Sequence, residues 1–166
     1  MARKSGLVRG WGPREVWLLA RTLPLVIIGS ILQNVVPMTR WGHLIGEVHR
    51  VPKELKSIRY RSELTGESAS IAKAIARACS LVPWTPSCLA QAFAGQRILR
   101  SRKRPGAVVV GLRPESATEW PAHAWLITDG QIITGGAISH QYFAASVHSF
   151  SNPLSALQPT SIPAKQ

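Results

Sequence analysis

The chain has 166 residues, of which 45% are hydrophobic and 17% are charged. This composition excludes a disordered chain, and the length is sufficient for one domain with its own core. The 20 Lys and Arg residues outnumber the 8 Asp and Glu residues, which gives a net charge of +12. This charge favours an anionic partner, which could be an acidic peptide, an acidic protein, nucleic acid or an anionic membrane. The charge alone does not distinguish among these partners.

Helical periodicity dominates the N-terminal part of the chain. Apolar residues at helical spacing run over residues 13–46, and Pro37 is expected to end or kink this helix. The most apolar stretch, 23–32, is shorter than the roughly 20 residues of a membrane-spanning helix, and Gln33-Asn34 interrupts it. It also lacks the cleavage site of a signal peptide. We therefore expect a helix that packs on the domain or on a partner, with peripheral membrane contact as the alternative.

The chain contains two cysteines, Cys79 and Cys88, which are too few for a disulfide framework. Cys79 belongs to an apolar stripe at helical spacing that begins near Ser68, so we expect it to be a small buried core residue. The cysteines and histidines lack the spacing of zinc ligands, and we predict no metal and no cofactor. A free reactive thiol fits a reducing, cytoplasmic setting best.

The segment Val82-Pro83-Trp84-Thr85-Pro86-Ser87-Cys88-Leu89 separates two predicted helices. Its prolines end the first helix, and Thr85 or Ser87 can cap the second, which is expected from about Cys88 to Arg100. Cys88 therefore falls in the first turn of a helix. The free N–H groups and the dipole of that turn stabilise an anion such as a thiolate.

A basic connection follows the second helix, with the sequence Arg100-Ser101-Arg102-Lys103-Arg104. It is interpreted either as a solvated loop or as a docking site for an acidic peptide. Three strands are predicted after it. Residues 107–112 are β-branched and apolar, and residues 122–128 alternate, with His123 on the same face as Trp125. Asp129-Gly130 is a strong signal for a two-residue hairpin that returns through residues 131–134. Helices followed by antiparallel strands predict an α+β fold.

Cys88 and His123 are the candidate catalytic pair. A thiol becomes an effective nucleophile at neutral pH when a base or a positive potential lies beside it. The helix start supplies the potential, and a histidine held on a rigid strand could supply the base. A lone histidine on a strand is more often structural, and the cysteine at the helix start is what favours catalysis here. The pair predicts a Cys–His hydrolase or an acyl-transfer enzyme, with Trp84 and Trp125 either lining the site or packing in the core.

Short segments surround this pair: Val82-Pro83-Trp84, Ser87-Cys88-Leu89, Ala122-His123-Ala124-Trp125 and Asp129-Gly130. They resemble the transglutaminase-like cysteine peptidase family of lasso peptide biosynthesis, which removes the leader from a ribosomally made precursor. The resemblance is specific over residues 68–136. It implies Cys88 as nucleophile, His123 as general base, and a transglutaminase-like or papain-like core in which the catalytic helix packs on an antiparallel sheet.

The predicted elements divide the chain into three parts. Residues 1–65 are expected to form a helical N-terminal region with a basic linker. Residues 66–148 are expected to form the transglutaminase-like cysteine peptidase core. Residues 149–166, rich in Ser, Pro and Ala, are expected to form a flexible C-terminal tail.

The family's third catalytic residue is where this sequence departs from the pattern. The resemblance implies an aspartate about twelve residues after the histidine, but that neighbourhood reads Thr134-Gly135-Gly136. The only aspartate of the chain, Asp129, lies six strand residues from His123, which is roughly 20 Å at about 3.3 Å per residue. A hydrogen bond needs about 3 Å, so Asp129 is better explained by the hairpin turn.

The hairpin also predicts what faces the imidazole. A two-residue turn that sets Thr128 opposite Gln131 sets His123 opposite Gly136. We expect a Cys–His dyad whose ring is oriented by a group other than a carboxylate. The candidates for that group are the Thr134 side chain, a carbonyl of Gly135-Gly136, or a side chain from Ser139 to Gln141.

The resemblance also implies partners. The substrate would be a precursor peptide with its leader, a separate small protein would recognise the leader, and an ATP-dependent lasso cyclase would take the freed core peptide. No fused recognition domain is expected, because residues 1–65 lack a strand-rich pattern. The alternatives are an amide-transferring enzyme of the same fold and a catalytically weak or inactive docking module, which the missing aspartate supports. A nucleic-acid-binding protein is disfavoured because no basic recognition helix stands out.

Overall fold

The computed structural model describes residues 12–57, 64–113 and 122–158. Within these ranges the chain forms α-helices, 3₁₀ helices (η) and strands in the order α1 (Pro13–Val35), α2 (Met38–Trp41), η1 (Gly42–Leu44), β1 (Glu47–His49), η2 (Lys53–Ser57), α3 (Gly66–Leu81), α4 (Cys88–Ser101), β2 (Ala107–Leu112), β3 (Ala122–Thr128), β4 (Gln131–Thr134), η3 (Gly136–Gln141), β5 (Phe143–Ser149) and α5 (Leu154–Leu157).

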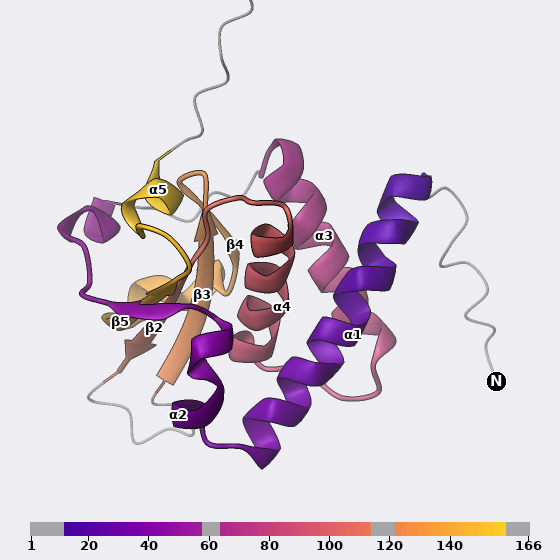
Figure 1. The fold of residues 1–166 in the computed structure, drawn as a ribbon, viewed down its shortest axis with the longest axis horizontal. Helices are drawn as coiled ribbons and strands as arrows, with labels where there is room; N and C mark the ends of the chain where they lie inside the picture. Colours follow the sequence, from indigo (N-terminus) through magenta and orange to yellow (C-terminus); the bar gives the residue numbers. More distant parts are fainter. Residues whose placement is uncertain (1–11, 58–63, 114–121, 159–166) are drawn as a thin grey trace, which may run out of the picture.

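The five strands form one antiparallel sheet in the order β1-β5-β2-β3-β4 (Figure 1). The three predicted strands, β2, β3 and β4, have the expected bounds. The two helices expected on either side of the proline-rich segment are α3 and α4. The predicted α+β fold, with helices packed on an antiparallel sheet behind an N-terminal helical region, is confirmed.

Strand alternation divides the apolar core into two layers, one on each face of the sheet. The face toward the long helices carries Val108, Ala124, Leu126 and Ile133. The opposite face carries Val109, Trp125, Ile127 and Val147, covered by Leu55 of η2 and Ala156 of α5. Helix α4 contacts both the sheet and α1, so it lies between them, as Figure 1 shows. This central place of α4 determines where its first residue, Cys88, meets the sheet.

Helix α1 packs one face on α3 and α4 and exposes the other. Gly29 allows the close approach of α4, since a Cβ there would lie 3.0 Å from the Phe93 ring and 3.1 Å from the Ala90 backbone. On the outer face, Ile31 and Val35 are 54% and 73% exposed. By length and composition alone the helix could cross a membrane, a test that the core helix of a soluble protein also passes. The predicted packing of this helix on the domain is confirmed for its inner face.

Two strands were absent from the predictions. β1 lies inside the stretch expected to be a basic linker, and it pairs with β5, which in turn pairs with β2. With three residues, β1 is too short to show the alternation that identifies a strand. Its hydrogen bonds come from a partner about 100 residues away in sequence.

The stretch expected to be a flexible tail begins inside ordered structure. β5 continues to Ser149, and α5 follows with Ala156 fully buried against the sheet. Residues 149–157 are therefore not an unstructured tail, because α5 covers the apolar face of the sheet that would otherwise contact water. Residues 159–166 lie outside the described residues.

Candidate functional site

Cys88 is the first residue of α4, and the residues before it fix where that helix begins. Ser87 has an extended backbone, and its Oγ accepts a hydrogen bond from the Ala90 N–H at 3.1 Å. The Gln91 side chain donates to the Pro86 carbonyl at 3.0 Å. The expected place of Cys88 in the first turn is confirmed, and Ser87 is the cap. The N–H groups of a first turn have no carbonyl partner within the helix. Here Ser87 Oγ accepts the N–H of Ala90 and the Cys88 side chain accepts that of Leu89, which leaves the Cys88 N–H without a partner among the described residues.

A chain of hydrogen bonds leads from Cys88 through His123 to the backbone of Gly135. The side chains of Cys88 and His123 are hydrogen-bonded, and the Ala124 N–H donates to Cys88 Sγ at 3.4 Å. His123 Nε2 lies 2.7 Å from the Gly135 carbonyl oxygen. A carbonyl can only accept, so Nε2 carries a proton, and Nδ1 is the nitrogen left to exchange a proton with the thiol.

Each partner shifts the pKa of the other toward a charged pair. Burial raises the pKa of the Cys88 thiol, but the hydrogen bond and charge of His123 and the backbone of Ala124 and Leu89 outweigh it, and the pKa is lowered. Burial lowers the pKa of His123, but its contacts with Cys88 and the Gly135 carbonyl outweigh this effect and raise it. The opposite shifts favour a thiolate beside an imidazolium, and the two groups titrate as a pair.

The hairpin that carries His123 differs from its predicted register. Thr128 lies opposite Gln131 as expected, but a bulge between Leu126 and Ile127 adds one residue to β4, and Leu126 lies opposite Thr134. Beyond the pair of Leu126 and Thr134, β3 and β4 are no longer paired. The expected position of His123 opposite Gly136 is therefore wrong, because a bulge is not visible in a period-two pattern.

Gly135 occupies the position at which the expected aspartate is missing. It comes directly after β4 with φ 71°, and this conformation turns its carbonyl toward His123. Of the predicted orienting groups, the backbone carbonyl is the one found. The Thr134 hydroxyl is buried without a hydrogen-bond partner among the described residues, and the Ser139 hydroxyl donates to the Gly136 carbonyl at 2.9 Å.

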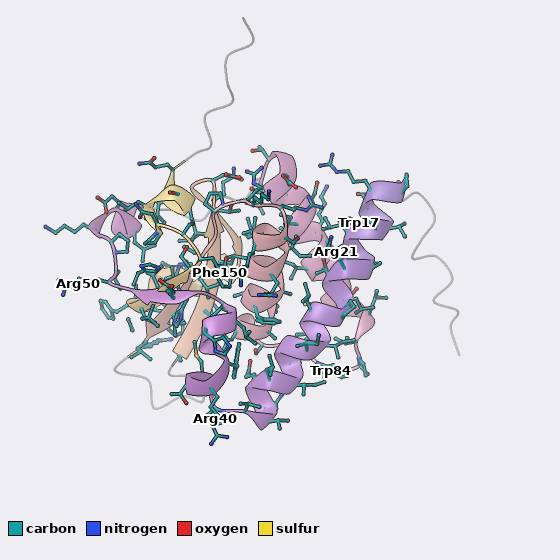
Figure 2. All side chains as sticks on the ribbon, in the orientation of Figure 1. Trp17, Arg21, Arg40, Arg50, Trp84 and Phe150 are labelled. Atoms are coloured by element: carbon teal, nitrogen blue, oxygen red, sulfur yellow. The ribbon has the colours of Figure 1, made fainter. Side chains whose placement is uncertain are left out.

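Aromatic rings hold the imidazole on its other sides. The ring centroids of Trp125 and Tyr142 lie 6.1 Å and 5.0 Å from that of His123. Trp125 is 5% exposed and belongs to the core of the sheet, and its ring packs beside the His123 ring without lining the cleft. Trp84 instead lines the cleft and is 45% exposed. Figure 2 shows it beside α1, on the loop that joins α3 to α4.

A cleft of about 530 Å³ opens over Cys88 and His123. Its walls come from three distant parts of the chain: α1, the loop before α4, and the start of β3 with η3. The contribution of α1, through Ser30, Gln33 and Asn34, is absent from the predicted site. The available signal was the pair of polar residues that interrupts an apolar helix. A smaller cavity of about 330 Å³ is lined by His123, by Gly135 and by the start of η3.

Asp129 lies at the hairpin turn, and its side chain bonds to residues outside the catalytic pair. Its backbone has φ 51° and that of Gly130 has φ 67°, as a two-residue turn of this sequence requires. Its carboxylate accepts a hydrogen bond from Ser68 Oγ at 3.1 Å and forms an ion pair with Arg104. This arrangement agrees with its interpretation as turn chemistry.

Asp129→Asn is expected to destabilise the protein and to leave catalysis unchanged. The carboxylate is 11% exposed, and hydrogen bonds between charged groups contribute about 1.5–3 kcal/mol, so we expect a loss of about 2 kcal/mol. Urea unfolding measures that loss, and acylation of Cys88 by p-nitrophenyl acetate measures reactivity. Glu67→Gln, which removes the other carboxylate bound to Arg104, is the matched control. A folded Asp129→Asn protein without reactivity would place Asp129 in the catalytic machinery.

The basic connection after α4 is largely engaged within the molecule. Arg102 and Arg104 both pair with Glu67, and the guanidinium of Arg100 lies 3.9 Å from the ring centroid of Phe150. These residues sit at the end of α4 opposite to Cys88. Their contacts favour a structural role, and a docking role for them stays a prediction.

The described residues contain no group of three or more His, Cys, Asp and Glu side chains that could hold a metal ion. A family model described as the transglutaminase-like superfamily matches residues 35–148, which is more than half of the chain and includes both Cys88 and His123. No significant match was found among curated proteins or among solved structures.

Proposed function

Because the chain belongs to the transglutaminase-like superfamily, we propose that it is a cysteine peptidase with Cys88 as nucleophile and His123 as general base. The observation that carries this proposal is the hydrogen-bonded series from Cys88 through His123 to the Gly135 carbonyl, at the wall of an open cleft. A Cys–His pair is already an activated nucleophile with its base, so a carboxylate is not required for the chemistry.

The proposed reaction has two halves. The Cys88 thiolate attacks the carbonyl carbon of the scissile bond, and the carbon–nitrogen bond breaks as His123 gives a proton to the departing amine. A thioester with Cys88 remains. His123, now neutral, takes a proton from water, whose oxygen attacks the thioester. The carbon–sulfur bond breaks, the acid product leaves, and the pair of Cys88 thiolate and His123 imidazolium is restored.

The substrate we propose is the precursor of a lasso peptide, from which the enzyme removes the leader. The support is the resemblance of the segments around Cys88 and His123 to the leader peptidases of lasso peptide biosynthesis. The net charge of +12 suits an acidic leader. In the proposed setting, the cytoplasm, a separate small protein presents the leader and an ATP-dependent cyclase receives the core peptide.

The outer face of α1 is the surface that we propose for docking of the recognition protein. It carries Trp17, Ile28, Ile31 and Val35, which are between 45% and 73% exposed. Exposed apolar residues aligned on one helix face are typical of an interaction site. Figure 2 shows Trp17 and Arg21 on this helix, and the Arg21 guanidinium lies 4.7 Å from the Trp17 ring centroid. The membrane surface is the competing occupant.

The test is mass spectrometry of a lasso precursor incubated with the protein and its recognition partner. Wild type is expected to release a leader-sized fragment, Cys88→Ala to release none, and Cys79→Ala to behave as wild type. Transfer of the acyl group to an added amine would indicate an amide-transferring enzyme. Absence of any cut, in an assay where a related peptidase cleaves its own precursor, would leave the inactive docking module as the better description.

A further inference from the structure

Attack by Cys88 on a carbonyl requires a site for the negative charge that develops on the carbonyl oxygen. Such sites use fixed donors in pairs, and a missing donor costs about 10²–10³ in rate. The free Cys88 N–H at the start of α4 supplies one donor. We propose that the side-chain amide of Gln33 on α1 supplies the second. This inference rests on the proposed function, because the oxyanion exists only when Cys88 attacks a carbonyl.

Gln33 lies in the wall of the cleft beside the start of α4. Helix α1 packs along α4, and its last turns bring Gln33 into the lining of the same cleft as Cys88 and His123. Gln33 Oε1 accepts a hydrogen bond from the hydroxyl of Ser87, the residue next to the nucleophile. The amide is therefore fixed at the start of α4.

The bond to Ser87 also determines which end of the amide is free. Ser87 Oγ already accepts from the Ala90 N–H at 3.1 Å, so its proton is available for an acceptor, which on Gln33 is Oε1. The donor nitrogen, Nε2, is then the end left for a ligand. Among the described residues it has no hydrogen-bond partner.

The other polar groups that α1 contributes to the cleft are already used. Asn34 Nδ2 donates to the Ser30 carbonyl at 2.7 Å, and Ser30 Oγ donates to the Val26 carbonyl at 2.9 Å. Gln33 is thus the residue of this helix whose donor is both anchored and available beside Cys88.

Two reactions of the same thiol separate an oxyanion donor from a group that acts on the thiol. Iodoacetamide forms a carbon–sulfur bond as iodide leaves from a saturated carbon, and no oxyanion forms. p-Nitrophenyl acetate is attacked at its carbonyl, forms an oxyanion, and releases nitrophenolate. Both rates are measured in a Cys79→Ala background at a pH where Cys88 is fully ionised. Gln33→Ala is expected to slow acylation by about 10²-fold and to change alkylation by less than about twofold.

Gln33→Glu distinguishes a donor from an anchor for Ser87. The carboxylate keeps an acceptor for the Ser87 hydroxyl but offers no N–H group, so we expect it to lose acylation as Gln33→Ala does. Wild-type acylation in Gln33→Glu would overturn the inference and leave Gln33 as a support for the helix cap. A parallel fall of both reactions in Gln33→Ala would overturn it as well. If wild type is alkylated but never acylated, the proposed function fails, and this inference fails with it.

Discussion

His123→Ala is expected to slow peptide cleavage by about 10³-fold, within the 10²–10⁴ that a positioned acid–base group contributes. The variant should also raise the pH at which Cys88 becomes reactive. Burial raises the pKa of Cys88, and the hydrogen bond and charge of His123 lower it together with the backbone hydrogen bonds of Ala124 and Leu89. Once His123 is removed, only the two backbone hydrogen bonds oppose burial, so the pKa rises. Cleavage therefore loses its proton donor, and the thiol loses its ionised form at neutral pH.

The direction in which kcat/KM changes with pH follows from the pKa shifts of Cys88 and His123. The active pair needs an ionised thiol and a protonated imidazole, so kcat/KM falls below the pKa of Cys88 and above that of His123. Because the first pKa is lowered and the second is raised, the active range is wider than the ordinary values of the two groups allow. His123→Ala should abolish the alkaline limb and move the acid limb to higher pH.

The pH at which Cys88 ionises can be measured without a substrate. The protein is alkylated with iodoacetamide over a range of pH, and mass spectrometry gives the extent of reaction at each cysteine. Cys79 is the internal control, because burial raises its pKa and no histidine opposes that effect. We expect Cys88 to react at lower pH than Cys79 in wild type, and the difference to shrink in His123→Ala. An unchanged pH profile of Cys88 in the variant would contradict the pairing of the two side chains.

The parts of the site that depend on local chemistry could be predicted from the sequence. The prolines and Ser87 fix the start of α4, and Asp129-Gly130 adopts the two positive φ angles that define its turn. These signals bring Cys88 to a helix terminus and His123 to a strand without knowledge of any distant contact. Cys88 and His123 come together because α4 packs on β3.

The parts that depend on distant contacts could not be predicted. β1 and β5 are recognisable only through their pairing, and the bulge in the β3–β4 hairpin shifts the register between the turn and His123. The group that orients the imidazole is the carbonyl of Gly135, which the sequence offers only as one of several candidates, because every residue type possesses a carbonyl and no motif singles this one out. Gln33 belongs to the site only because α1 crosses the start of α4.

Gly135→Ala is expected to reduce cleavage by about 10²-fold, the cost of displacing a catalytic group by about 1 Å. The backbone of Gly135 has φ 71°, and a Cβ there would lie 2.4 Å from the Ala124 carbonyl oxygen and 3.1 Å from His123 Nε2. The first contact is with backbone, so the loop must move and carry the Gly135 carbonyl away from the imidazole. The ring then loses the acceptor that fixes its tautomer.

Gly66→Ala is the matched control for the backbone conformation alone. Gly66 has φ +60°, and a Cβ there would meet nothing within 4 Å. Both variants carry the cost of a positive φ, roughly 1–2 kcal/mol, which urea unfolding measures. Only Gly135→Ala should also lose cleavage.

The pH profile separates a lost orienting bond from general damage. The Gly135 carbonyl is one of the groups that raise the pKa of His123. Its displacement lowers that pKa, so the alkaline limb of kcat/KM should move to lower pH in Gly135→Ala and stay in place in Gly66→Ala. A Gly135→Ala protein that keeps both the wild-type rate and the wild-type alkaline limb would mean that the imidazole is oriented by another group.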